Sequence, residues 1–469
     1  MKKHLFGLSI ALFFICFGAQ VSAQSITNKM FSFGSYGRVG AGFSPAIKGN
    51  IGRSFNLNGM GSVGGRMEEA DYVEFAGALH FKPETIQNDT TLINAQARIA
   101  MYSSKGQLIG NVSSTSYGGV AFALPEIYAE ANHIMGSKWS AWIGAKYFRN
   151  ANVHIADYFY FDDHSSQGLG VTFDKTTVAV LFPGSIDTGS SVPPNFYVNI
   201  VDGTRRLGLR GRSMLVAEHL IPFNDNKQTI KLLGEYHHLA DAPQGDTSAF
   251  NYPSAGGWVA GIQLSTDIST AISGSSNQAS VRYGHGIANG GDGGNTKTWL
   301  TYGAPDLESD KFNKAYSITF VDHILLNVSP KYSFNAYGVF TNSHGAAASD
   351  GKAMDHYGRE IFNRKTEYAV GLRNFWYIKK WFHLMTELHY ANRKDGDQES
   401  AGMAKFSIVP TIVPTAKADP WVRPHLRLIH SIAKYNQFAT DNLYSPYLAE
   451  IGHKSWGHYI GIRAEWWLF

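Results

Sequence analysis

The stretch HYIGIRAEWWLF, residues 458–469, changes character at every second position. In an extended chain successive side chains point to opposite faces, so the stretch divides into two faces. One face is apolar and comprises Ile460, Ile462, Ala464 and Trp466. The other face mixes aromatic, small and charged residues and comprises Tyr459, Gly461, Arg463, Glu465 and Trp467. This period of two predicts a β-strand with one apolar and one wet side, and it places Trp467 on the wet side.

The same alternation recurs along the chain in short segments separated by clusters of Gly, Asn, Asp and Ser. The clearest of these segments are residues 72–81, 95–103, 176–182, 228–237, 258–266, 315–322, 332–340, 366–376 and 381–390. No helical period of useful length and no shift in composition interrupts the series. We therefore expect one all-β domain over residues 24–469.

Residues 1–23 have the pattern of a secretory signal peptide. Lys2 and Lys3 precede a mostly apolar run over residues 5–17, and Val21-Ser22-Ala23 supplies a small-residue cleavage site. The run is too short for a bilayer-spanning helix of about 20 residues. The single cysteine, Cys16, lies within this segment, so the mature chain has no thiol for disulfide or thiolate chemistry. We expect the protein to be exported.

The composition narrows the class of exported all-β protein. Charged residues make up 17% of the chain, against roughly 25% in soluble domains, while 13% are aromatic and 49 residues are glycine. A net charge of +4 is too small for nucleic-acid binding. The strands of a two-sheet sandwich would show the same alternation of apolar and polar side chains. A closed barrel additionally explains the export and the aromatic content, because lipid requires every backbone group to be paired. We predict an antiparallel transmembrane β-barrel.

The stretch 142–162, WIGAKYFRNANVHIADYFYFD, resembles the constriction segment of the maltoporin family of trimeric sugar-specific porins. Shorter pieces agree in order: YGRVG at 36–40, YVEF at 72–75, VDH at 321–323, WVRP at 421–424 and the last strand at 458–468. The resemblance implies an 18-stranded barrel whose third loop folds inward to narrow the pore. It also implies a homotrimer in the outer membrane of a Gram-negative bacterium, with lipid and an oligosaccharide as partners and neither metal nor cofactor.

A sugar channel needs aromatic rings for the apolar faces of pyranose rings and polar groups for their hydroxyls. The resemblance assigns an aromatic slide to Tyr36, Tyr72, Trp421 and Trp467. It assigns a polar track to Arg38, Glu74, Asp157 and Asp162. A further slide residue in the second loop has two candidates, Tyr117 and Phe122. The family's mid-chain slide phenylalanine is missing here, because residues 275–278 are polar.

The constriction departs from the family pattern. It is assigned to Asn150, Asn152, His154 and Phe159, where Asn150 replaces the family's arginine, Asn152 an aspartate and Phe159 a tyrosine. The neighbouring Arg149 would lie on the opposite face if the segment were extended. These residues predict a less charged and wider constriction than in a maltodextrin specialist.

Facilitated diffusion of maltose and maltodextrin-type oligosaccharides is the function that the resemblance implies. Asparagine at the arginine position also occurs in the related sucrose porin, so a general or sucrose-like diffusion porin is the alternative. A barrel hydrolase, suggested by Asp162-Asp163-His164, is an alternative of another class. Such an enzyme needs a nucleophile with a positioned base, and no Ser–His–acid pattern stands out. We expect neither catalytic residues nor a metal site.

Overall fold

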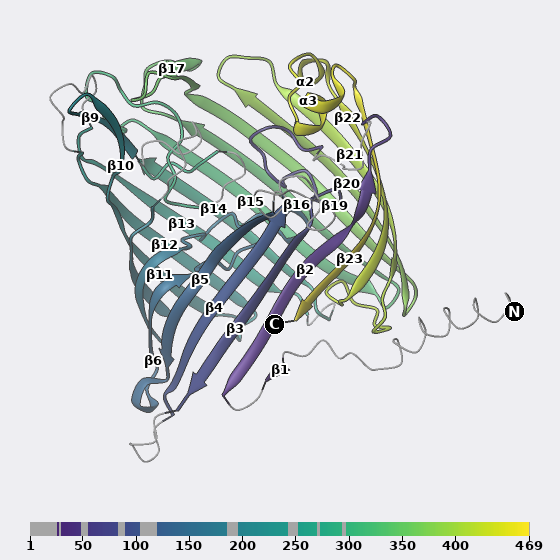
Figure 1. The fold of residues 1–469 in the computed structure, drawn as a ribbon. Helices are drawn as coiled ribbons and strands as arrows, with labels where there is room; N and C mark the ends of the chain where they lie inside the picture. The colour runs from purple at the N-terminus through teal and green to yellow at the C-terminus, as the bar shows by residue number, and fades with distance from the viewer. Residues whose placement is uncertain are drawn as a thin grey trace, which may run out of the picture.

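The computed structural model describes residues 26–27, 30–47, 55–82, 90–103, 120–184, 196–242, 252–269, 273–292 and 297–468. The expected signal peptide, residues 1–23, lies outside the described residues. Eighteen antiparallel strands, each paired with its neighbours in chain order, form one closed wall (Figure 1). The predicted β-barrel is therefore confirmed.

The wall strands are β2 (Phe31–Phe43), β3 (Tyr72–Phe81), β4 (Leu92–Ser103), β5 (Val120–Asn132), β6 (Trp139–Lys146), β7 (Ser166–Phe173), β8 (Thr176–Leu181), β11 (Arg212–Phe223), β12 (Gln228–Leu239), β13 (Ala255–Asp267), β14 (Ser276–Gly286), β15 (Tyr316–Ser329), β16 (Tyr332–His344), β19 (Arg364–Lys379), β20 (Phe382–Asp395), β21 (Ala401–Ile412), β22 (His425–Tyr435) and β23 (Trp456–Leu468). Strand β23 pairs with β2 and closes the ring, with Trp467 opposite Tyr36 and Glu465 opposite Arg38. This pairing leaves no open strand edge in the wall, which is what a bilayer requires.

Shorter elements decorate the wall. They are β1 (Ile26–Thr27), the hairpin of β9 (Phe196–Val201) and β10 (Thr204–Leu209), the hairpin of β17 (Lys352–Met354) and β18 (Glu360–Phe362), two 3-10 turns (Ile134–Gly136 and His154–Ala156), and the helices α2 (Gln437–Asp441) and α3 (Pro446–Ile451). Side chains cap both helices, because Asn436 accepts from the Ala439 amide and Ser445 from the Leu448 amide. No helix among the described residues is long and apolar enough to cross a membrane.

The faces of β23 agree with the predicted alternation. Arg463 and Glu465 are buried on the inner side, whereas Ile462 is 56% exposed on the outer side. The outer wall carries many other exposed apolar side chains, such as Leu428 and Val370. This distribution is typical of a barrel whose outer surface faces lipid and whose interior is polar.

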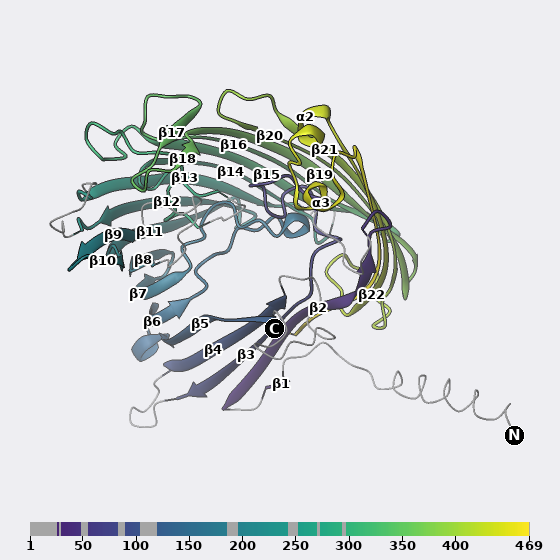
Figure 2. The ribbon, with the colours of Figure 1, turned by 45° about the horizontal axis from the view of Figure 1, so that its top comes forward.

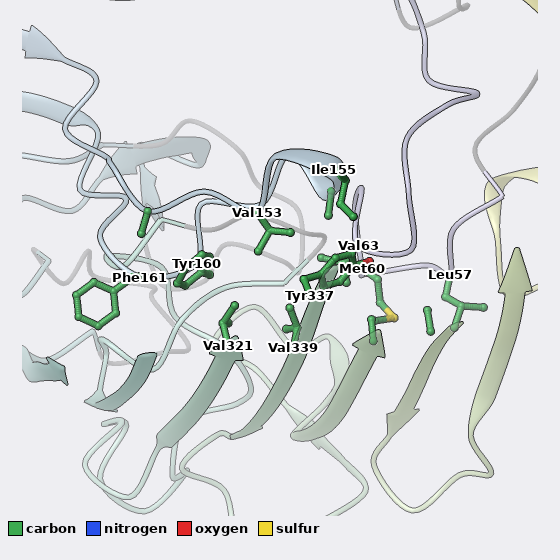
Figure 3. Close-up of a cluster of buried hydrophobic side chains, with 14 of the residues drawn as sticks. Leu57, Met60, Val63, Val153, Ile155, Tyr160, Phe161, Val321, Tyr337 and Val339 are labelled. Atoms are coloured by element: carbon green, nitrogen blue, oxygen red, sulfur yellow. The ribbon is translucent and has the colours of Figure 1, made fainter. Parts of the chain in front are cut away.

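Two loops fill part of the interior. Loop 1 (residues 44–71) connects β2 to β3, and loop 3 (residues 147–165) connects β6 to β7 and runs inside the ring of strands (Figure 2). Val153 and Tyr160 of loop 3 and Met60 of loop 1 pack in one apolar cluster with Val321 and Val339 of the wall (Figure 3). The predicted inward-folded third loop is confirmed.

Candidate functional site in the barrel interior

The four predicted slide residues lie side by side along the seam of the barrel. The rings of Tyr36 and Tyr72, on β2 and β3, have their centroids 5.9 Å apart. Tyr36 is the register partner of Trp467 on β23. The ring of Trp467 lies 6.4 Å from that of Trp421, in the turn before β22. We call these four residues the aromatic row: ring contacts join Tyr36 to Tyr72 and Trp421 to Trp467, and strand pairing brings the two pairs together at the seam.

Loop 3 reaches this row through His154. Its ring centroid lies 5.1 Å from that of Trp421 and 5.4 Å from that of Trp467. Burial lowers the pKa of His154 well below its usual range, and the nearby charge of Arg423 lowers it further. A neutral imidazole thus faces the two tryptophans.

Arg423 was not among the predicted site residues, yet it contacts the slide directly. Its guanidinium carbon lies 4.1 Å from the ring centroid of Trp467, a cation–π distance. Its Nη2 atom is 3.3 Å from Glu465 and 3.5 Å from His154 Nε2. The only signal in the sequence was its place beside Trp421 in the WVRP piece of the family resemblance.

Arg38 and Glu74 flank the aromatic row as the polar track requires. The guanidinium carbon of Arg38 lies 5.3 Å from the ring centroid of Tyr72, and its Nη2 is 3.1 Å from Glu69 of loop 1. Glu74 accepts a 3.1 Å hydrogen bond from the Tyr72 hydroxyl and pairs with Arg98 at 3.2 Å. Both residues therefore place charge beside Tyr72.

Asp157 and Asp162 occupy different environments. The side chain of Asp157 is 41% exposed and lies 3.4 Å from Arg66. Asp162 is fully buried, where it accepts 3.0 Å hydrogen bonds from the amides of Asn150 and Ala151 and pairs with Lys231. Asp162 thus holds loop 3 against the wall and does not face the open lumen, contrary to its expected place on the polar track. The family resemblance identified Asp162 as an acidic position, but it did not show which groups bond to its carboxylate.

Of the remaining constriction residues, Phe159 contacts Arg149. Arg149 lies between two aromatic rings, 3.8 Å from the centroid of Phe159 and 4.1 Å from that of Tyr147. The segment around it is not a strand, so the expected opposite-face placement of Arg149 does not apply. Asn150 is exposed, while Asn152 is half-buried. A cation is therefore held close to the position where the family pattern has one.

A buried polar network fixes the end of loop 3. The two ring nitrogens of His164 lie 3.3 Å from Glu218 and 3.3 Å from Glu235, on β11 and β12. Burial alone would lower the pKa of His164, but the two carboxylates raise it to about 10. His237 in turn lies 2.7 Å from Glu235. These contacts assign the histidine of the Asp162-Asp163-His164 sequence to anchoring. Within the described ranges no group of His, Cys, Asp and Glu side chains is arranged to hold a metal.

The two uncertain slide positions have different outcomes. Tyr117 lies outside the described residues, and Phe122 is 54% exposed on the outer face of β5, like Leu124. At the polar mid-chain wall, Tyr160 of loop 3 donates a 3.3 Å hydrogen bond to Gln278 of β14. Tyr160 was missed by the sequence analysis, because no strand pattern predicts which loop side chain approaches that wall.

Comparison with protein families finds one match: a model described as LamB porin covers residues 31–467. Among solved structures, the outer membrane channel DcaP of Acinetobacter baumannii is 10% identical with a TM-score of 0.44, over 95% of this chain and 99% of that chain. Wzi, described as a carbohydrate-binding β-barrel of Escherichia coli, is 9% identical with a TM-score of 0.41, over 92% of this chain and 83% of that chain. No curated protein matches the sequence.

Proposed function

The chain belongs to the LamB porin family, and from this membership we propose that it forms a homotrimeric pore for maltose and maltodextrin-type oligosaccharides. A porin of this family is a multi-pass β-barrel of the outer membrane and a channel rather than an enzyme. Residues 1–23 would direct export, and residues 24–469 would form the single barrel domain. Sugars would cross by facilitated diffusion along the aromatic row.

The observation that supports the proposal is that strand pairing brings the ring pairs Tyr36–Tyr72 and Trp421–Trp467 together at the barrel seam. Pyranose rings can stack on one aromatic ring after another, because each ring offers a similar apolar face. The charges of Arg38 and Glu74 at the edge of the row can exchange hydrogen bonds with sugar hydroxyls. Repeated weak contacts of this kind permit binding and release.

Block of ion current in a planar bilayer tests the proposal. Purified trimers are expected to close reversibly and saturably on addition of maltotriose, with a lower half-blocking concentration than for maltose. Absence of block by any maltodextrin would reject a sugar-specific channel and leave a general diffusion pore.

A sucrose-like pore is the second candidate, favoured by the exposed Asn150 at the constriction. An opening without a long side chain at position 150 would admit a compact disaccharide as readily as a linear one. Titration with sucrose beside maltose separates the two candidates, because preference for sucrose in half-blocking concentration would favour the second.

A further inference from the structure

A cavity beside the aromatic row is walled mainly by guanidinium groups. Its charged lining residues are Arg38, Arg66, Arg373, Arg427, Arg463 and Glu465, and His154 completes the wall toward the tryptophans. These residues come from loop 1, loop 3 and the strands β2, β19, β22 and β23. The fold thus gathers on one side of the lumen arginines that are scattered through the sequence.

Carboxylates balance only part of this charge. Glu69 pairs with Arg38 and Arg66 at 3.1 Å each, and Asp157 lies 3.4 Å from Arg66. Glu465 pairs with Arg427 and, at 3.3 Å, with Arg423, while Glu387 pairs with Arg373. Arg463 has no carboxylate within ion-pair distance among the residues that the structure describes; its Nη1 donates instead to the Met67 carbonyl at 3.4 Å. A positive charge therefore remains uncompensated in the cavity wall.

Hydrogen-bond donors also remain unused in the wall of the cavity and beside it. The Nε atoms of Arg423, Arg427 and Arg463 are buried and have no hydrogen-bond partner in the described part of the chain. The side chain of Arg463 is itself 94% buried, since its exposed fraction is 6%. A buried donor without a partner is unfavourable, and an oxyanion can accept from a guanidinium through two parallel hydrogen bonds.

We propose that this cavity binds the oxyanion of an acidic saccharide, a phosphate or carboxylate carried by a sugar whose ring stacks on Trp467. Arg423 links the two parts, because it contacts the ring of Trp467 and the carboxylate of Glu465 together. The inference rests on the proposed sugar channel and names a substrate class for it. A neutral sugar could use the aromatic row without engaging the uncompensated charge of Arg463.

Current block by matched probes tests this inference: maltose, maltose 1-phosphate, maltobionate and inorganic phosphate. We expect each acidic disaccharide to block at about one tenth of the half-blocking concentration of maltose, because charge-assisted hydrogen bonds add to the same stacking. Arg463→Gln should abolish this advantage and leave the block by maltose unchanged. Arg463→Lys should retain part of it, since the charge persists without the planar fork.

Arg364→Gln is the matched control. It removes the same charge from the beginning of β19, where Arg364 pairs with the exposed Asp350 outside the cavity, and should leave all four titrations unchanged. Unchanged block by maltose shows that each variant is folded. Block by maltose with no advantage for either acidic disaccharide overturns the inference and leaves the proposed function standing. An advantage that survives Arg463→Gln also overturns it, as does inorganic phosphate blocking as well as maltose 1-phosphate. Absence of block by every saccharide contradicts the proposed function itself.

Discussion

The side chain of Trp467 contacts residues from several parts of the fold. Its ring lies beside Trp421, His154 and Arg423, so it joins the aromatic row, loop 3 and the arginine-lined cavity. The alternation of residues 458–469 was enough to place Trp467 on the inner face. Only the fold could show these neighbours, because His154 comes from loop 3 and Trp421 and Arg423 come from the turn before β22.

Replacing Trp467 by alanine should weaken sugar binding. Loss of one stacking partner is expected to raise the half-blocking concentration of maltotriose about tenfold, which corresponds to about 1.4 kcal/mol. Trp456→Ala is the control, because Trp456 lies on the outer face of the same strand. An equal loss of affinity in both variants would contradict a specific role for Trp467.

Restoring an arginine at position 150 tests the predicted wide constriction. Asn150 is exposed at the start of the inward segment of loop 3, so a longer side chain there should narrow the opening. Asn150→Arg is expected to lower the single-channel conductance, whereas Asn150→Gln should change it little. A conductance that rises in Asn150→Arg would contradict the hypothesis of a wider constriction.

Residue roles could be predicted only where a pattern or resemblance marked them. The alternation of residues 458–469 correctly predicted that Arg463 and Glu465 face inward. It did not predict that Arg373 and Arg427, on other strands, lie beside them. Asp162 matched a charged family position, yet its carboxylate is occupied by loop amides and Lys231. Partners of a charged group depend on tertiary neighbours, which one sequence does not reveal.

At the level of elements, loop 3 is the segment that runs inside the barrel and packs against its wall. Tyr160 holds the loop to β14, and Asp162 and His164 hold it to β11 and β12. The ion pairs are almost fully enclosed, so removal of one partner leaves a buried charge unpaired. Loop 3 is thus fixed by its own polar residues as well as by its apolar packing.

The His164 anchor should weaken at alkaline pH. In the folded protein the pKa of His164 is about 10, against about 6.5 for an unfolded chain. Its stabilising contribution is therefore complete below pH 6.5 and is lost as the pH rises through 10. The melting temperature of the folded protein should fall over this range in the wild type and fall less in His164→Gln. The exposed His219 provides the control: if His219→Gln flattens the profile equally, His164 is not the group responsible.

Strand positions were predictable, and their connections through space were not. The predicted segment 72–81 coincides with β3, and 458–469 overlaps β23 (Trp456–Leu468). The predicted segment 95–103 begins after the observed start of β4 at Leu92, because the first residues of this strand alternate less strictly. The His164 anchor joins residues from loop 3, β11 and β12, a separation that no local period reports.

At the level of the whole molecule, the seam between β2 and β23 closes the barrel and is closely packed. A Cβ atom at Gly40 would lie 2.2 Å from the carbonyl oxygen of Ile462. At Gly338 of β16 no described atom lies within 4 Å of that position. Gly40→Val should therefore lower the free energy of unfolding by about 2 kcal/mol, the usual effect of overpacking. Gly338→Val should unfold close to the wild type in a urea titration of reconstituted protein, and equal losses would refute a special role for the seam.

The pairing of the first and last wall strands also sets an order of assembly. The strand β2 emerges early in synthesis and must wait for β23, whose thirteen residues follow all the other wall strands. Until then both margins of the sheet present free amides and carbonyls, and these invite pairing with another unfinished chain. A polypeptide that ends before Trp456 therefore lacks the strand that closes the barrel, and its β2 keeps an unpaired edge.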